Sequence, residues 1–365
     1  MKTFAIFIAI LFFSLSSPAQ VLKPIPPGGN KKAMVAEQIG ITDVEIHYDR
    51  PGVKGREGKI YSTPIVHAGY ADLGFGTSKA APWRAGANEN TTIDFSTDVK
   101  IEGQNLPAGK YGFFVAYDPN ECTLIFSKNS TSWGSFFYND KEDALRVKVK
   151  PVALDKNVEW LKYEFMNQTD NSAIIALDWE KIRIPFKVEV DLVKTRLDNF
   201  RLTLRGREGF RWEVADEAAK LCLDNNTNLE EGMQWSDDAV SFDQNFTDLS
   251  TNAALNEKLG HKTKADSVMK IAMEKANKFE LHQYGRKLIS QKKNKEALEI
   301  FQLNAKKHPK DFTTYAGLAR GYSANGDYKT ALVNAKLALP LAPNDLNKTS
   351  VQTFIEKLGK GMDIN

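Results

Sequence analysis

The sequence predicts a multidomain β + α protein, in which an antiparallel β-sandwich or barrel is followed by an α-helical solenoid of stacked repeats. In the first half, apolar and polar residues alternate in short runs, which is the period of a half-buried strand. After Val193 the period changes from two to nearly four, and Ala, Leu, Lys and Glu replace the aromatic residues. Towards the C-terminal end, similar residues recur every 34 positions, an interval typical of stacked helical hairpins.

The first 19 residues have the order of a secretory signal peptide. Lys2 precedes an apolar run over residues 4–13, and small residues stand at Ser17 and Ala19, the two positions that a signal peptidase recognises. The apolar run covers about half of the roughly 20 residues that a membrane-spanning helix needs. We therefore expect cleavage before Gln20, no membrane span in the mature chain, and a periplasmic or extracellular location.

A linker over residues 20–30 and a β domain over residues 31–193 are expected next. The linker contains three prolines and two glycines, which exclude a helix or a central strand. In the β domain, Val44, Ile46 and Tyr48 alternate with polar residues, and turn signals separate runs of this kind. Nine short strands arranged in this way are typical of a sandwich or barrel. The predicted strands cover residues 44–48, 92–96, 99–102, 110–117, 122–126, 146–150, 159–165, 172–179 and 184–193.

Residues 51–82 form a long, glycine-rich stretch that shows no sustained period. Irregular segments of this length are uncommon inside compact domains, and they are often functional where they occur. We therefore expect the specific activity of the β domain to depend on loops.

Residues 194–365 are predicted to form a helical repeat domain that resembles the tetratricopeptide type. Ala297 and Ala331 lie 34 residues apart, and so do Pro309 and Pro343. A small residue where two helices cross and a proline that ends the second helix fit that repeat. Earlier small residues extend the series, since Gly232, Ala265, Ala297 and Ala331 are 33, 32 and 34 residues apart. Clear repeats are expected over residues 278–311 and 312–345, degenerate pairs over 208–277, and a last helix over 349–358.

Several motifs of the β domain resemble a known family. They are Asp-Arg-Pro-Gly-Val-Lys-Gly-Arg at residues 49–56, Trp-Arg-Ala-Gly-Ala-Asn-Glu-Asn-Thr-Thr at 83–92, Leu-Pro-Ala-Gly-Lys-Tyr at 106–111 and Trp-Gly at 133–134. Over residues 30–192 the chain resembles the secreted bacterial family catalogued as domain of unknown function 2911. The resemblance implies a β domain that is often followed by helical repeats, and it implies no reaction. Residues 63–81 depart from it, because they are longer and richer in glycine than expected.

Two segments around Arg50 and Arg84 are polar, charged and flanked by predicted strands, so we expect them to converge at one end of the sheets. Arginine forks suit carboxylate or phosphate groups, and an exposed tryptophan can stack on a sugar ring. The alternative is structural, with ion pairs that hold loops and tryptophans that belong to the core. The candidate ligand-binding residues are Asp49, Arg50, Trp83, Arg84, Asn88, Glu89 and Trp133.

Stronger catalytic signatures are missing from the sequence. The five histidines have no metal-ligand spacing, and no Gly-x-Ser-x-Gly motif occurs, so we predict neither a metal nor a cofactor. The 49 basic and 46 acidic residues are intermingled and leave a net charge of +3, which argues against nucleic-acid binding. Asp49 and Glu89 form a carboxylate pair that would suit acid–base hydrolysis if the two groups meet.

The sequence therefore favours an exported, non-enzymatic binding or scaffold protein. We expect a polar-ligand or saccharide site in the β domain and a surface on the repeats for an envelope or secreted protein partner. The alternative is a hydrolase that acts on envelope or imported glycans through carboxylates of the β domain.

Overall fold

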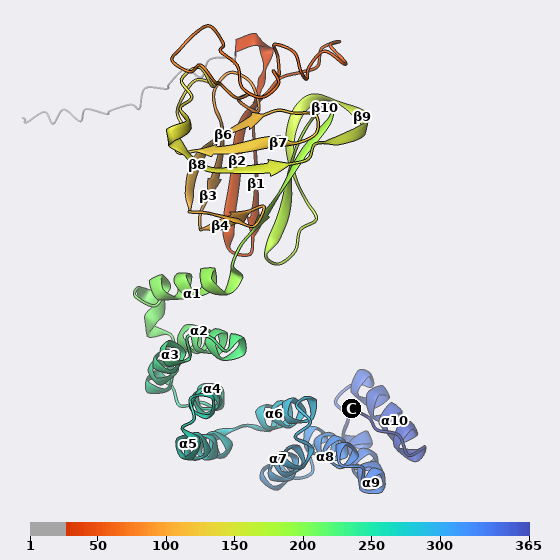
Figure 1. Cartoon of the computed structure of the whole chain (residues 1–365). Helices are drawn as coiled ribbons and strands as arrows, with labels where there is room; N and C mark the ends of the chain where they lie inside the picture. The colour runs from red at the N-terminus through yellow and green to blue at the C-terminus, as the bar shows by residue number, and fades with distance from the viewer. Residues whose placement is uncertain (1–26) are drawn as a thin grey trace, which may run out of the picture. The chain divides into compact units, whose positions relative to one another are not determined.

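A computed structural model describes residues 27–365 of the chain. The predicted signal peptide and residues 20–26 of the predicted linker lie outside the described residues. The chain divides into two compact units, one ending at Thr195 and the other covering Arg196–Asn365 (Figure 1). We call the first the β domain and the second the helical domain, and we describe each by itself.

Ten strands of the β domain form two antiparallel sheets. The larger sheet has the order β1-β2-β3-β6-β7-β8 and the smaller has the order β5-β4-β10-β9, and neither closes into a barrel. The predicted class of antiparallel β structure is thus confirmed. The strands are β1 (Lys31–Ile39), β2 (Thr42–Arg50), β3 (Thr91–Phe95), β4 (Val99–Ile101), β5 (Gln104–Leu106), β6 (Gly109–Ala116), β7 (Cys122–Ser127), β8 (Asp143–Val149), β9 (Val152–Met166) and β10 (Ser172–Glu189).

Aromatic side chains from both sheets meet in one core. The ring of Phe113 on β6 lies 5.6 Å from that of Phe186 on β10, and Phe126 on β7 lies 6.0 Å from Phe186. The alternation that predicted β2 is visible in its burial, because Val44 and Ile46 point into this core while the residues between them are exposed. Burial of one face of each sheet therefore holds the two sheets together.

The structure differs from the predicted strands in three places. β1 was not predicted, because residues 33–36 of this edge strand are all apolar and its sequence therefore does not alternate, although its exposure does. β5 lies between two predicted strands and was not itself predicted, because a three-residue strand leaves no periodic signal. β10 is one continuous strand where two were predicted, and irregular pairing with β9 between Asp178 and Ile182 interrupts its period.

Residues 51–90 connect β2 to β3 without any helix or named strand. Backbone hydrogen bonds hold this segment to β6, with Trp83 and Val115 exchanging two at 2.9 and 2.8 Å. Gly69 donates to the carbonyl of Tyr117 at 2.7 Å. The long loop is therefore fixed to the larger sheet at defined points, which positions the polar residues that follow Trp83.

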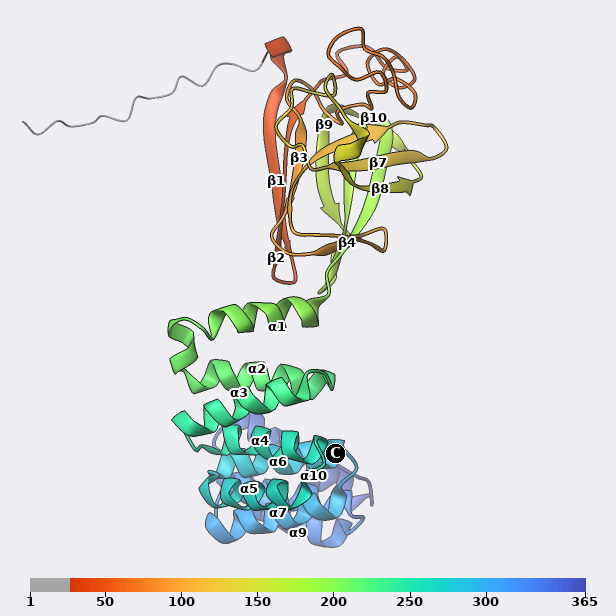
Figure 2. The ribbon, with the colours of Figure 1, turned by 60° about the vertical axis from the view of Figure 1, so that its left-hand side comes forward.

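Helices that lie side by side in pairs build the helical domain (Figure 2). The pairs are α2/α3, α4/α5, α6/α7 and α8/α9, and α10 packs on the last pair. The predicted helical repeats are thus present. The helices are α1 (Leu192–Thr203), α2 (Trp212–Asn225), α3 (Leu229–Phe242), α4 (Phe246–Lys258), α5 (Lys262–Lys275), α6 (Lys278–Ser290), α7 (Asn294–Lys307), α8 (Phe312–Ala324), α9 (Tyr328–Ala338) and α10 (Asp345–Gly359).

The small residues that revealed the repeat occupy equivalent places. Gly232, Ala265, Ala297 and Ala331 lie on α3, α5, α7 and α9, the second helix of each pair, and all four are buried. Gly232 has no room for a larger side chain, because a Cβ there would lie 2.6 Å from the Cβ of Cys222 on α2. Close helix crossing is the physical reason for the sequence period.

The ring of Phe301 on α7 joins the last two pairs. It is fully buried, and it packs against Gly285 on α6 and against Gly317 and Gly321 on α8. A Cβ at any of these three glycines would come within 2.8 Å of a ring atom. Two helices thus approach the ring closely only because their contact residues lack side chains.

A buried acidic pair lies between α2 and α4. Asp248 is fully buried, and burial together with the nearby charges of Asp216 and Asp243 raises its pKa to about 7. Lys220 and Asn245 lower the pKa of Asp248. Nζ of Lys220 donates to Oδ2 of Asp216 at 2.6 Å. The helical domain therefore carries a carboxyl that titrates near neutral pH.

We predict that Asp248→Asn reduces the pH dependence of the stability of the helical domain. Because the pKa of this carboxyl is higher in the folded than in the unfolded state, the fold favours its protonated form. The resulting stabilisation is fully present below about pH 4 and is lost as the pH rises through about 7. The variant should therefore gain roughly 1 to 3 kcal/mol over wild type at pH 8 and less at pH 5. Urea unfolding followed by circular dichroism measures this, with the exposed Asp238→Asn as control. Equal pH dependence in wild type and Asp248→Asn would contradict the prediction.

Candidate ligand site in the loops of the β domain

Arg84 is the central charged group of the candidate site. Its Nη1 donates to the carbonyl of Asn88 at 2.6 Å, and its Cζ lies 5.0 Å from the ring centroid of Phe136. The guanidinium rests against Gly134, where a Cβ would lie 2.2 Å from the Arg84 Cζ. Among residues 27–365 no carboxylate forms an ion pair with it. Burial lowers the pKa of Arg84, yet a guanidinium stays charged in proteins.

Exposed aromatic rings lie on the two loops next to Arg84. Phe75 packs edge-on against Phe136 at 5.5 Å and Phe137 at 6.2 Å, and the backbone of Ser78 donates to the carbonyl of Phe136 at 3.0 Å. Trp133 immediately precedes the glycine that touches Arg84. We call Phe75, Trp133 and Phe137 the exposed rings, because 65%, 48% and 46% of these residues, respectively, is exposed. Several large exposed rings on neighbouring loops are typical of a contact surface.

Three of the predicted site residues meet at the end of β2. Asp49 is buried, and its pKa is raised. Burial is the largest cause and the charge of Glu89 acts in the same direction, whereas the charge of Lys32 lowers the pKa. The Asn88 side chain and the Glu89 backbone also lie close to the carboxyl of Asp49, and both act to lower its pKa. Glu89 forms an exposed ion pair with Lys32. The structure therefore brings Asp49, Asn88 and Glu89 together.

Two buried polar atoms of this cluster have no hydrogen-bond partner among the described residues. They are Oδ1 of Asp49 and Nδ2 of Asn88. Asn88 adopts a left-handed backbone conformation with φ near 54°, which asparagine tolerates better than most residues. Its Oδ1 accepts a hydrogen bond from Nδ2 of Asn30 at 3.2 Å. Unsatisfied buried polar groups cost folding free energy, and they often mark functional positions.

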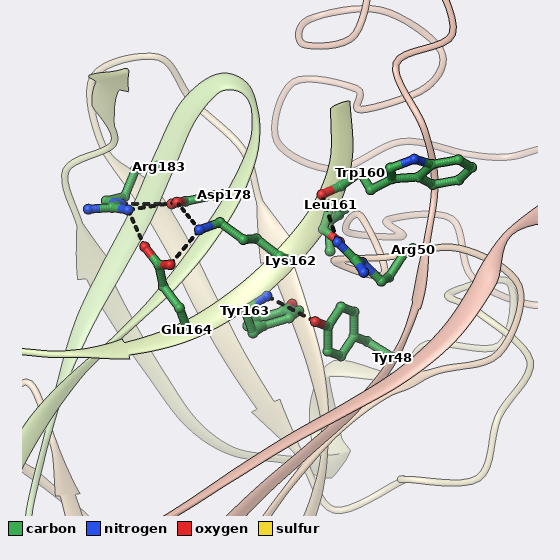
Figure 3. Close-up of polar contacts among 9 residues, drawn as sticks. All are labelled: Tyr48, Arg50, Trp160, Leu161, Lys162, Tyr163, Glu164, Asp178 and Arg183. Carbon is green, nitrogen blue, oxygen red and sulfur yellow. Dashed lines mark hydrogen bonds and ion pairs between the residues drawn. The ribbon is translucent and has the colours of Figure 1, made fainter. Parts of the chain in front are cut away.

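Two other predicted residues lie elsewhere. Arg50 reaches across to β9, where its Nε donates to the carbonyl of Leu161 at 2.7 Å (Figure 3). Trp83 is buried and stacks on Trp179 of β10, with the ring centroids 6.1 Å apart. The contacts of Arg50 and Trp83 are those expected of side chains that hold loops or belong to the core. The remaining candidates, Asp49, Arg84, Asn88, Glu89 and Trp133, lie on or beside the loops after β2 and β7.

A charged network on β9 and β10 was not predicted. Nε of Arg183 donates to Oδ1 of Asp178 at 2.7 Å, and Glu164 forms ion pairs with Arg183 and with Lys162 (Figure 3). Two acidic and two basic side chains compensate each other here, so the network is suited to holding the two strands together. No spacing in the sequence indicated it, because the irregular pairing of β10 sets which residues meet.

The exposed rings at Phe75 and Phe137 were also missed. The signals in the sequence were the run Phe136-Phe137-Tyr138 and a phenylalanine between Gly74 and Gly76. Consecutive aromatic residues are equally typical of a buried strand, so no pattern indicated that these rings lie on a surface. In residues 27–365, no group of three or more histidine, cysteine, aspartate or glutamate side chains could hold a metal ion, and no helix could cross a membrane.

Two antiparallel sheets followed by stacked helical pairs define a class of protein with a β domain and a repeat domain in one chain. Residues 30–188 match the sequence model of the family described as "Protein of unknown function (DUF2911)". This match confirms the resemblance that the motifs indicated. A comparison with curated proteins found no match.

Solved structures with partial similarity include two repeat proteins. MamA from Desulfovibrio magneticus RS-1 has 14% identity and a TM-score of 0.26, covering 42% of this chain and 95% of that chain. YrrB, titled "a TPR protein with an unusual peptide-binding site", has 15% identity and a TM-score of 0.28, covering 44% and 84%. These scores are low, so the assignment of helical repeats depends on the helical pairs themselves.

We predict that Arg50→Met destabilises the β domain by about 1 to 3 kcal/mol, because it removes a hydrogen bond to the backbone of the buried Leu161. Chemical unfolding followed by tryptophan fluorescence measures this loss. Arg207→Met, at an exposed arginine, is the matched control and should change stability by less than about 0.5 kcal/mol. A loss no larger than that of the control would show that Arg50 is not a structural clamp.

Proposed function

We propose that the protein is an exported, non-enzymatic binding protein whose β domain takes an acidic saccharide and whose helical repeats dock a protein partner. One observation carries the first part of this proposal. The half-buried guanidinium of Arg84 has no ion pair among the described residues, and it lies beside loops that carry the exposed rings.

The guanidinium of Arg84 and the exposed rings both match the chemistry of an acidic sugar. The planar guanidinium fork of Arg84 suits a carboxylate, which accepts two parallel hydrogen bonds. The faces of Phe75, Trp133 and Phe137 offer apolar area to the C–H face of a sugar ring. A neutral saccharide would use only the rings, so the site favours the acidic form.

Support for a protein partner comes from the helical domain. Each helical pair buries its apolar side only by stacking on the next, and stacked pairs present an extended surface suited to protein segments. The predicted signal peptide would place such a partner among envelope or secreted proteins. The charge of the chain gives no support for a nucleic-acid partner.

We predict that the full chain binds a uronic-acid oligosaccharide more tightly than the neutral oligosaccharide of the same length in titration calorimetry. Trp133→Ala should weaken binding about tenfold, because a stacked ring contributes roughly 1 kcal/mol or more. Arg84→Lys should remove most of the preference for the acidic sugar, since it keeps the charge and loses the fork. Phe279→Ala, at an exposed phenylalanine of α6, is the control and should leave affinity unchanged.

Absence of binding to both sugars, or affinity unaffected by Trp133→Ala, would contradict the saccharide proposal. The hydrolase alternative is favoured by one feature, since Asp49 is a buried carboxyl with a raised pKa beside the exposed Glu89. If the acidic oligosaccharide is cleaved, and either Asp49→Asn or Glu89→Gln abolishes turnover, the protein is a hydrolase.

The partner proposal has its own test. The immobilised full chain should recover the same few envelope or secreted proteins in repeated pull-downs, and Trp133→Ala should not change this recovery because Trp133 lies in the β domain. Recovery of nothing above an empty-bead background would contradict the partner proposal and leave the saccharide proposal intact.

A further inference from the structure

The segment after α10 turns back onto the helical domain. Gly361 adopts a left-handed conformation with φ near 69°, and the backbone N–H of Met362 donates to the carbonyl of Lys357 at 3.0 Å. This glycine ends the helix and reverses the chain. The next residues then lie against α8 instead of extending into solvent.

Residues Asp363–Asn365, which we call the tail, bind α8 as a short peptide would. The hydroxyl of Ser323 donates to Oδ1 of Asp363 at 2.6 Å and accepts from the backbone N–H of Ile364 at 3.2 Å. Nδ2 of Asn365 donates to the backbone carbonyl of Arg320 at 3.1 Å. Backbone and side-chain hydrogen bonds thus fix three consecutive residues along one turn of the helix.

Ile364 provides an apolar anchor. It is only 6% exposed and belongs to a buried cluster with Ala319 of α8 and with Phe354 and Leu358 of α10. A buried aliphatic side chain flanked by hydrogen-bonded backbone is the usual arrangement of a docked peptide segment. The tail therefore fills an apolar position that α8 and α10 leave between them.

Arg320 of α8 is the positive charge beside the tail, and its Nη1 donates to the carbonyl of Ile364 at 3.5 Å and to Oδ1 of Asn365 at 3.4 Å. Arg286 and His282 come from α6, and α6 and α8 are the first helices of successive pairs. Figure 1 places the C-terminal end of the chain between α6 and α10, close to α8. Burial, Arg320 and Arg286 together lower the pKa of His282 to about 4, so this histidine carries no charge at neutral pH.

In the described part of the chain, Arg286 and Arg320 form no ion pair, and the carboxylate that acts on Arg320 is that of Asp363 in the tail. Arg320 instead lies over the ring of Phe354, 4.6 Å from its centroid. The face made of α6, α8 and α10 thus offers two arginines and one apolar position, the latter between α8 and α10, to a ligand with carboxylates and an aliphatic side chain.

We propose that this face is a docking site for a protein segment in which an acidic residue adjoins a large aliphatic one, and that the tail occupies it in cis until such a segment displaces it. The inference rests on the proposed partner-binding role of the repeats and adds the partner's chemistry and an autoinhibitory contact. A tail of this kind is present at an effective concentration of about the millimolar range, so weak external segments would be excluded.

The test uses the full chain and a fluorescein-labelled synthetic peptide, Gly-Lys-Gly-Met-Asp-Ile-Asn, which has the sequence of residues 359–365. In an opened variant, Asp363→Asn combined with Ile364→Ser, fluorescence anisotropy should show at least tenfold tighter peptide binding than in wild type. Adding Arg320→Gln should reverse this gain, and binding to the opened variant should weaken with salt. Leu346→Ser, at an exposed leucine of α10, is the control and should bind the peptide as wild type does.

Equal binding of the peptide to wild type and opened variant would overturn the proposal, and so would binding no tighter than that of a scrambled peptide. If the opened variant fails to fold, Asp363→Lys provides a second test, because it changes an exposed residue and places a positive charge beside Arg320. A folded Asp363→Lys chain must also bind the peptide more tightly than wild type, and no gain would overturn the proposal.

The outcomes separate this site from the broader partner role. If the opened variant gains peptide binding but pull-downs recover nothing, the cis contact stands and the partner proposal fails. If pull-downs succeed while the opened variant gains no peptide binding, the partner role stands and its location on α6 and α8 is wrong.

Discussion

The paired backbone hydrogen bonds between Trp83 and Val115 are the constraint on which the candidate site depends. They fix the long segment between β2 and β3 to the larger sheet, while the Trp83 ring stacks on Trp179 of the smaller sheet. Because Arg84 follows Trp83 directly, its guanidinium is held against Gly134 without any regular secondary structure of its own. Ligand sites on loops need such rigid supports, and here the core provides it.

The same constraint explains why Arg84 keeps an uncompensated charge. A half-buried guanidinium without an ion pair costs folding free energy, and that cost is tolerated because Asn88 and the Phe136 ring partly replace water. By contrast, the charged groups of β9 and β10 pair fully with one another. In this domain, charged side chains that pair with one another serve the fold, whereas a charged side chain without an ion pair is a candidate for ligand binding.

Much of the fold could be predicted because burial imposes periods on the sequence. Val44 and Ile46 face the core of the two sheets, and the 34-residue spacing of Ala297 and Ala331 follows from close helix crossings. Edge strand β1 could not be predicted, since its apolar residues 33–36 are consecutive and its sequence carries no two-residue period. Likewise, the sequence pointed to Arg84 through a charged motif between strands, but it could not show that Arg50 binds the backbone of β9.

Contacts between residues far apart in sequence set the remaining features. Phe136 meets Arg84 across 52 positions, and Ser323 meets Asp363 across 40. Neither pair has a local signature, because folding of the whole domain creates the proximity. The exposed rings were missed for the related reason that composition alone does not distinguish a buried aromatic residue from one on a loop surface.

The most direct test of the central claim is a nuclear magnetic resonance titration of the full chain with the uronic-acid oligosaccharide, followed through the indole N–H signals of its six tryptophans. Our account predicts that the signal of Trp133 shifts strongly together with the side-chain Nε–H of Arg84, while those of Trp212 and Trp235, which belong to the helical domain, stay in place. Shifts confined to the helical domain, or no shift at Trp133 with saturating sugar, would contradict the claim that the loops of the β domain form the ligand site.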